Sequence, residues 1–113
     1  MKIFRFSCTL LAAISSPAWA VCSATNCPDV IVQLLYPSTD GKAYVKIDAS
    51  LTPLNCTPLA GGYLSLIRSD QNSDWIYATL LTAVAANGGK LANVRIVEGS
   101  AGCIIAYVWQ RPL

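Results

Sequence analysis

The chain has 113 residues, of which 54% are hydrophobic and 12% are charged, and its formal net charge is +2. It contains no histidine, which excludes Ser-His-Asp and Cys-His catalysis and removes the commonest metal ligand. A charge this close to balance argues against nucleic-acid binding, because such binding needs a basic surface that releases counterions.

The first 20 residues, MKIFRFSCTLLAAISSPAWA, have the pattern of a secretory signal peptide. Lys2 and Arg5 precede an apolar run, and Ala18-Trp19-Ala20 fits the small-x-small rule for cleavage. We therefore expect cleavage near Ala20, and export of the mature protein to the periplasm or the cell exterior. The valine directly before Cys22 is unfavourable for lipoprotein processing, so a lipid anchor is the weaker interpretation.

Residues 21–113 would then form a single disulfide-bonded domain of 93 residues, with six basic and six acidic side chains. No stretch within it approaches the roughly 18 uninterrupted apolar residues of a membrane span, so we expect none. An uncharged, apolar domain also tends to associate, which makes a homo-oligomer a candidate state.

Four cysteines follow the leader: Cys22, Cys27, Cys56 and Cys103. In a small exported domain, four cysteines indicate two disulfides, for which three pairings are possible. A zinc site of four thiolates is the alternative. Such sites usually show paired C-x2-C spacings, whereas four residues separate Cys22 from Cys27. We therefore expect no metal and no cofactor.

The first predicted strand is 30–36, which is rich in β-branched residues and ends before Pro37. It should place Val30, Val32 and Leu34 on one face. After a turn at 38–41, residues 42–49 alternate strictly between apolar and polar side chains. We expect the face toward the core to consist of Ala43, Val45, Ile47 and Ala49. The face toward solvent should consist of Lys42, Tyr44, Lys46 and Asp48.

An irregular connection follows at 51–62, where two prolines, Cys56 and a glycine pair interrupt any regular pattern. The third predicted strand is 63–69, the fourth is 92–97, and a turn at 99–102 leads to the fifth at 103–109. The fifth strand is apolar on both faces, so it is either central or part of a contact surface.

The only predicted helix lies within 73–89, SDWIYATLLTAVAANGG. Ser73 is the expected N-cap, with Asp70 and Asp74 adding negative charge at the helix start. Asn87-Gly88-Gly89 should end the helix, because these residues tolerate a left-handed backbone. Apolar residues at helical spacing predict one broad buried face, formed around Ile76, Leu80 and Val84.

The opposite side of this helix carries no charge, although a solvated helix face normally shows Lys, Glu or Arg. It consists of Trp75, Thr79, Thr82 and Ala86. Either other parts of the same chain cover this side, or it is a subunit interface, and the sequence leaves both explanations open.

The resulting order, β-β-β-α-β-β, is that of a five-stranded OB-like Greek-key barrel with its helix after the third strand. In that barrel the third and fifth strands run parallel at the closing seam, which brings Cys56 within reach of Cys103. We therefore expect a Cys56–Cys103 disulfide and, by elimination, a Cys22–Cys27 disulfide. A ferredoxin-like or other α+β arrangement is the alternative, since these elements do not fix topology.

The leader, the mature size, the bridged OB-like strand order and the long uncharged helix resemble the B subunits of AB5 toxins, such as the subtilase cytotoxin, pertussis-like and cholera-like groups. The resemblance spans nearly the whole mature chain and rests on architecture rather than on a diagnostic motif. It implies a ring, usually pentameric, with helices around a central pore and barrels that bind cell-surface glycans. The short spacing of Cys22 and Cys27 departs from those toxins.

Tyr44, Lys46 and Asp48 are the candidate ligand-binding residues, because sugars are commonly held by an aromatic ring and a few polar groups. The same three residues would also fit an ordinary solvated strand face. Trp75 and Trp109 are alternative contact residues.

Two carboxylate pairs could in principle perform acid–base catalysis, namely Asp70 with Asp74 and Asp48 with Glu98. The first pair is better explained as helix-start residues, and Asp48 as a solvent-facing strand residue, so we expect no enzyme. We expect instead a non-catalytic exported binding module, in its specific form an oligomeric glycan- or receptor-binding subunit. The alternative is a monomeric periplasmic or secreted protein with a structural or inhibitory role, acting through a protein–protein surface.

Overall fold

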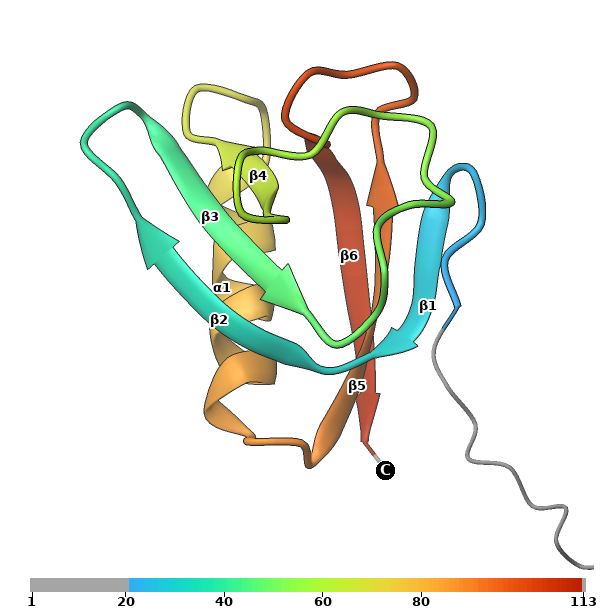
Figure 1. Cartoon of the computed structure of the whole chain (residues 1–113). Coiled ribbons are helices and arrows are strands. Elements are labelled where there is room, and N and C mark those ends of the chain that lie inside the picture. Colours follow the sequence, from blue (N-terminus) through green and yellow to red (C-terminus); the bar gives the residue numbers. More distant parts are fainter. Residues whose placement is uncertain (1–20, 113) are drawn as a thin grey trace, which may run out of the picture.

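The structure is a computed structural model that describes residues 21–112. The predicted signal peptide, residues 1–20, lies outside the described residues. The described part holds six strands and one helix (Figure 1). In chain order they are β1 (Asn26–Val30), β2 (Val32–Pro37), β3 (Lys42–Ile47), β4 (Leu64–Ile67), α1 (Ser73–Ala85), β5 (Lys90–Ile96) and β6 (Ile105–Pro112).

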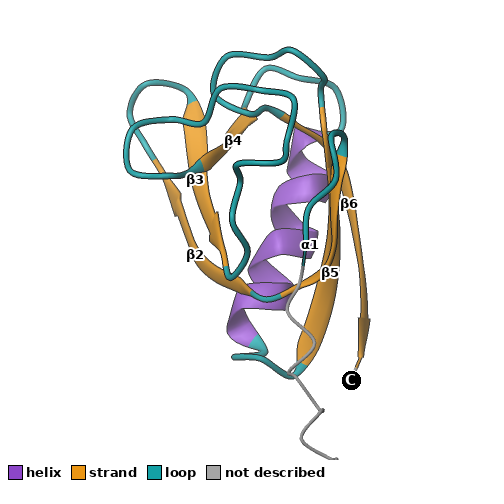
Figure 2. Ribbon diagram, turned by 45° about the vertical axis from the view of Figure 1, so that its right-hand side comes forward, coloured by secondary structure: helices purple, strands orange, loops and turns teal. Residues whose placement is uncertain are grey.

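The strands form two three-stranded antiparallel sheets, in the orders β1-β5-β6 and β2-β3-β4. Helix α1 contacts β2 and β4 of one sheet and β5 and β6 of the other. Figure 2 shows it running between the two sheets. The predicted mostly-β fold with a single helix is therefore confirmed, although the helix follows four strands here and not the predicted three.

The prediction of a five-stranded closed barrel is wrong for the described residues. The first predicted strand is two strands, because the chain bends at Ile31 so that β1 pairs with β5 and β2 with β3. Asp48 holds this bend: its carboxylate accepts a hydrogen bond from the Ile31 N–H at 2.8 Å, and its own N–H donates to the Ile31 carbonyl at 3.1 Å.

The predicted orientation of Leu34 is wrong, because β2 contains a bulge. The register shifts between Val32 and Leu34, so Val32 stays buried whereas Leu34 turns outward and is 38% exposed. An inserted residue reverses every side chain beyond it, because strand side chains alternate with a period of two. Leu35 packs against the core in place of Leu34.

Where a barrel would close, β4 and the start of β6 meet only at isolated parallel bridges, Ser65–Ile104 and, ahead of both strands, Thr57–Ala101. β4 has four residues, and Cys103 just before β6 has a left-handed backbone with φ 44°. A continuous ladder needs extended backbone on both sides, so this seam remains open.

Both predicted disulfides are confirmed. Cys56–Cys103 joins the long connection after β3 to the start of β6, with the Cα atoms 5.0 Å apart, and Cys22–Cys27 closes a short N-terminal loop. The zinc alternative is wrong, because all four sulfur atoms are bonded in pairs. Two disulfides fit an oxidising, exported compartment. Within residues 21–112, no helix is long and apolar enough to cross a bilayer.

The core lies between the two sheets and α1. Every element contributes at least one buried apolar side chain, among them Val30, Val32, Val45, Leu64, Leu80, Val94 and Ile105. The strict alternation of β3 is confirmed, since Ala43, Val45 and Ile47 are all buried. Ile76 and Leu80 of the predicted helix face are buried, and Val84 packs against the core.

The helix starts differently from the prediction. Asn72, with a left-handed backbone at φ 66°, is the N-cap and makes no side-chain capping bond, whereas Ser73 is the first helical residue. Ser73 is already inside the first helical turn, and its hydroxyl is directed back to the Arg68 carbonyl, to which it donates at 2.7 Å. The predicted end is confirmed: Asn87 and Gly88 have φ values of 52° and 90°, which terminate the helix.

Candidate functional site

The three predicted ligand-binding residues lie on the solvent side of the β2-β3-β4 sheet, but all three already have hydrogen-bond partners, Tyr44 through its hydroxyl to Asp40. The Lys46 amine donates to the Gly61 carbonyl at 2.9 Å. The Asp48 carboxylate holds the bend at Ile31. Asp48 is four residues from Tyr44, about 13 Å along an extended chain, so the structure does not bring these two together.

The structure instead surrounds Tyr44 with two further tyrosines that sequence reasoning did not select. Tyr36 stacks on Tyr44 with ring centroids 5.1 Å apart. Tyr63 stands edge-on to both rings, at 6.1 Å from Tyr36 and 5.7 Å from Tyr44. We call Tyr36, Tyr44 and Tyr63 the tyrosine cluster. Offset and edge-on arrangements of this kind are the favourable geometries for aromatic pairs.

Cross-strand register builds the cluster. Tyr36 of β2 lies directly opposite Tyr44 of β3, and Tyr63 immediately precedes β4, the next strand of the sheet. The observed turn is centred on Asp40, so that Pro37 lies opposite Ala43 and Tyr36 opposite Tyr44. Equal spacing about the turn predicted at 38–41 would instead place Tyr36 opposite Ala43, so that prediction did not signal the pair. Nothing local signalled that Tyr63 would join them.

One of the three tyrosine hydroxyls in the cluster is hydrogen-bonded, and this bond shifts its pKa. The Tyr44 hydroxyl donates to Asp40 at 3.1 Å, and this bond raises the pKa of Tyr44 above its ordinary value of 10.0, because it favours the protonated phenol. The hydroxyls of Tyr36 and Tyr63 bond to no other residue within 21–112. The Lys46 amine lies 5.1 Å from the centre of the Tyr63 ring, in a cation–π contact.

A hollow of about 420 Å³ is lined in part by Lys46, whose amine lies over the Tyr63 ring and so connects the hollow to the cluster. Its lining combines apolar and hydroxyl-bearing side chains, including Leu51, Ser50 and Thr52. The Ser50 hydroxyl donates to that of Thr52 at 3.1 Å. The tyrosine cluster and this hollow together form a surface with aromatic rings, one cation and two hydroxyls.

The rest of the described chain covers the predicted interface residues of α1 only in part. Trp75 is 77% exposed and Thr82 is exposed, whereas Thr79 and Ala86 are half-buried. Covering by the same chain therefore does not explain the missing charges around Trp75 and Thr82. The hydroxyls of Thr79 and Thr82 donate to the helix backbone, at 3.0 and 2.9 Å, which leaves an outer face of low polarity.

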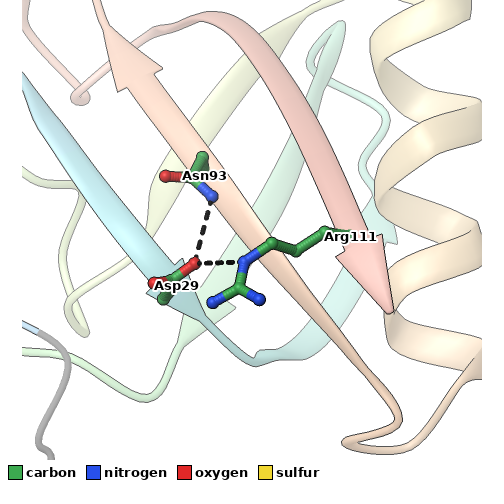
Figure 3. A network of polar contacts seen from close by, with 3 residues as sticks. All are labelled: Asp29, Asn93 and Arg111. Carbon is green, nitrogen blue, oxygen red and sulfur yellow. Dashed lines mark hydrogen bonds and ion pairs between the residues drawn. The ribbon is translucent and has the colours of Figure 1, made fainter. Parts of the chain in front are cut away.

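A polar network crosses the other sheet. One carboxylate oxygen of Asp29 accepts hydrogen bonds from Arg111 Nε at 3.1 Å and from Asn93 Nδ2 at 3.4 Å (Figure 3). The bond from Arg111 holds the pKa of Asp29 below its ordinary value. Since the three residues lie on β1, β5 and β6, the network ties the strands together, but its contribution to stability is small because both charged groups are exposed and screened by solvent.

Two of the four carboxylates considered for catalysis, Asp48 and Glu98, lie in structural contacts. Asp48 holds the bend at Ile31, and Glu98 accepts a hydrogen bond from the Asn55 side chain at 3.1 Å. Within residues 21–112, no group of three or more His, Cys, Asp or Glu side chains could hold a metal ion.

No protein-family model, curated protein or solved structure matches this chain. Its function must therefore be inferred from the chemistry of its own surfaces.

Proposed function

We propose that this chain is a non-catalytic exported glycan-binding module whose binding site is the tyrosine cluster with its adjoining hollow. The observation that carries the proposal is the packing of Tyr36, Tyr44 and Tyr63 on the solvent side of a sheet. Tyrosines buried for stability alone would face the core, which lies on the opposite side of this sheet. Aromatic rings stack on the apolar faces of sugar rings, and nearby polar groups fix their orientation.

The strand connectivity supports the same assignment. We interpret the fold as an open variant of the OB-like order, in which β1 and β2 together replace a single first strand. In OB folds, the face formed by strands two and three binds oligonucleotides or oligosaccharides. The corresponding strands here are β3, which carries Tyr44, and β4, which Tyr63 immediately precedes. Six basic and six acidic residues in the predicted mature chain favour a sugar over a nucleic acid.

The outer face of α1 supports an oligomeric form. From Trp75 to Gly89 the sequence has no charged residue, and Trp75 and Leu81 are 77% and 49% exposed. Burying these side chains against a second copy would be favourable, because each removes a large apolar area from water. An assembly of the AB5 B-subunit type, in which several glycan sites act together, is consistent with this face.

The test is a glycan array probed with the disulfide-bonded mature chain, residues 21–113, followed by calorimetry on the best sugar. Tyr36→Ala should weaken binding at least about tenfold, because it removes the most exposed stacking ring. Tyr36→Phe keeps the ring and should bind within about threefold of the natural protein. Equal binding by Tyr36→Ala, or the absence of any array signal, would refute the site.

The same purified chain can be used to distinguish glycan binding from the alternative function, inhibition of another protein. Light scattering coupled to size exclusion should give a mass of several copies for the natural protein and a lower mass for Trp75→Ala. A monomer that binds no glycan and forms a stoichiometric complex with a protein would favour the inhibitor.

A further inference from the structure

The outer face of the β1-β5-β6 sheet presents two aromatic side chains that pack against no other aromatic ring among the described residues. Tyr107 and Trp109 project from β6 and are 49% and 52% exposed. The register places Arg95 opposite Tyr107 and Asn93 opposite Trp109 on β5, and Asn26 of β1 lies opposite Arg95. Residues directly opposite in neighbouring strands share a face, so these five side chains form one continuous surface.

These side chains surround a small hollow of about 100 Å³, whose lining consists of Asn26, Asn93, Val94, Arg95, Tyr107 and Trp109. This hollow accommodates one charged or polar substituent of a ligand, whereas the rest of a sugar would lie outside it, against the exposed aromatic rings.

The charge on this face is not compensated. Of its two arginines, Arg111 is paired with Asp29 at 3.1 Å. The Arg95 guanidinium makes no ion pair or hydrogen bond with another residue in the range 21–112. An unpaired guanidinium binds carboxylate or sulfate oxygens with two parallel hydrogen bonds, which are stronger than bonds between neutral groups.

The neighbouring amide adds a second donor. The Asn26 side-chain oxygen accepts a hydrogen bond from the Ser23 hydroxyl at 2.8 Å. Its oxygen is thereby engaged, and its NH2 group has no partner within the described part of the chain. The hollow thus combines the NH2 of Asn26 with the guanidinium of Arg95, a set of donors that suits an anion.

We propose that this face is a second glycan-binding site, separate from the tyrosine cluster, and that it takes a sugar carrying a carboxylate or sulfate group. The anionic group lies between Arg95 and Asn26, and the sugar ring stacks on Trp109. A nucleic acid also offers rings and anions, but it requires a row of cations, whereas this face has one unpaired arginine beside the Arg111–Asp29 pair. The inference extends the proposed glycan-binding function to an acidic substrate class.

The test uses calorimetric titration of the mature chain with sialyllactose, with a sulfated heparin disaccharide and with uncharged lactose. The natural protein should bind at least one acidic sugar about tenfold more tightly than lactose. Arg95→Gln should abolish this preference, and Trp109→Ala should weaken binding of all three sugars at this site. Arg111→Gln is the matched control: it removes the same charge from the same face and should keep the preference within about twofold.

Three results would overturn the inference. One is an equal loss of preference in Arg95→Gln and Arg111→Gln, which would indicate unspecific attraction. Another is tighter binding of an oligothymidine than of either acidic sugar. The third is binding of acidic sugars no tighter than of lactose.

Two variants separate this site from the tyrosine cluster. If Tyr36→Ala abolishes glycan binding while Arg95→Gln changes nothing, the first site stands and the second fails. If Arg95→Gln abolishes the acidic preference while Tyr36→Ala changes nothing, the second site stands and the cluster is not a binding site.

Discussion

Replacing Cys56 and Cys103 together by alanine should destabilise the domain more than replacing Cys22 and Cys27. The first bridge spans a sequence separation of 47 and the second a separation of 5. A disulfide restricts the unfolded chain, and its stabilisation grows with the logarithm of loop length. That relation gives about 4 kcal/mol for the long loop and about 2 kcal/mol for the short one.

The difference is large relative to the stability of so small a domain. Globular domains of this size have unfolding free energies of roughly 5–14 kcal/mol, so the long bridge supplies about a third or more. Its loss should lower Tm by about 15–30 °C. The bridge also lies beside backbone hydrogen bonds between Thr57 and the turn at 100–102, so the amides there should exchange faster with solvent once it is removed.

Urea unfolding of the two double-alanine variants, followed by circular dichroism, measures both losses. The two variants are well matched, because each loses two sulfur atoms and each loses one of them from a fully buried position, Cys27 or Cys103. A short-loop variant that loses as much free energy as the long-loop variant would refute the reasoning. If the slope of unfolding free energy against urea concentration is the same in both variants, their free energies can be compared directly.

Asp40→Asn should move the pKa of Tyr44 back toward 10.0, because the carboxylate that raises it is gone; alkaline absorbance titration of tyrosine measures this. Since the folded-state pKa of Tyr44 is raised, its bond to Asp40 stabilises the fold at neutral pH, and urea unfolding at several pH values should show the contribution disappearing as pH rises through that pKa. Leu80→Ala should cost about 3–5 kcal/mol in urea unfolding, whereas Val97→Ala, at a 46% exposed position outside the proposed subunit interface, should stay within about 0.5 kcal/mol. Gly102→Ala should cost more than about 1 kcal/mol by the same assay, because φ is +92° there and a Cβ would lie 3.0 Å from a buried serine hydroxyl; an unchanged Gly102→Ala or a costly Val97→Ala would contradict the packing described.

Features encoded within a few residues were predictable from the sequence. The alternation of β3, the buried face of α1 around Ile76 and Leu80, and the helix end at Asn87 each follow from local periodicity or local backbone preference. The disulfide pairing followed as well, once the order of the elements suggested that Cys56 and Cys103 meet.

Tertiary contacts decided the rest. Ser73 has the chemistry of an N-cap, but the helix begins one residue earlier than predicted, with Asn72 at the cap position and the Ser73 hydroxyl directed to the Arg68 carbonyl. The first strand divides at Ile31 because Asp48, distant in sequence, binds the backbone there. The binding surfaces depend on register in the same way: a sequence pattern states which face of a strand Tyr44 or Arg95 occupies, but not which residue lies opposite. Register is set by the packing of the whole domain, and it alone assembles the tyrosine cluster on one sheet and the Arg95–Trp109 surface on the other.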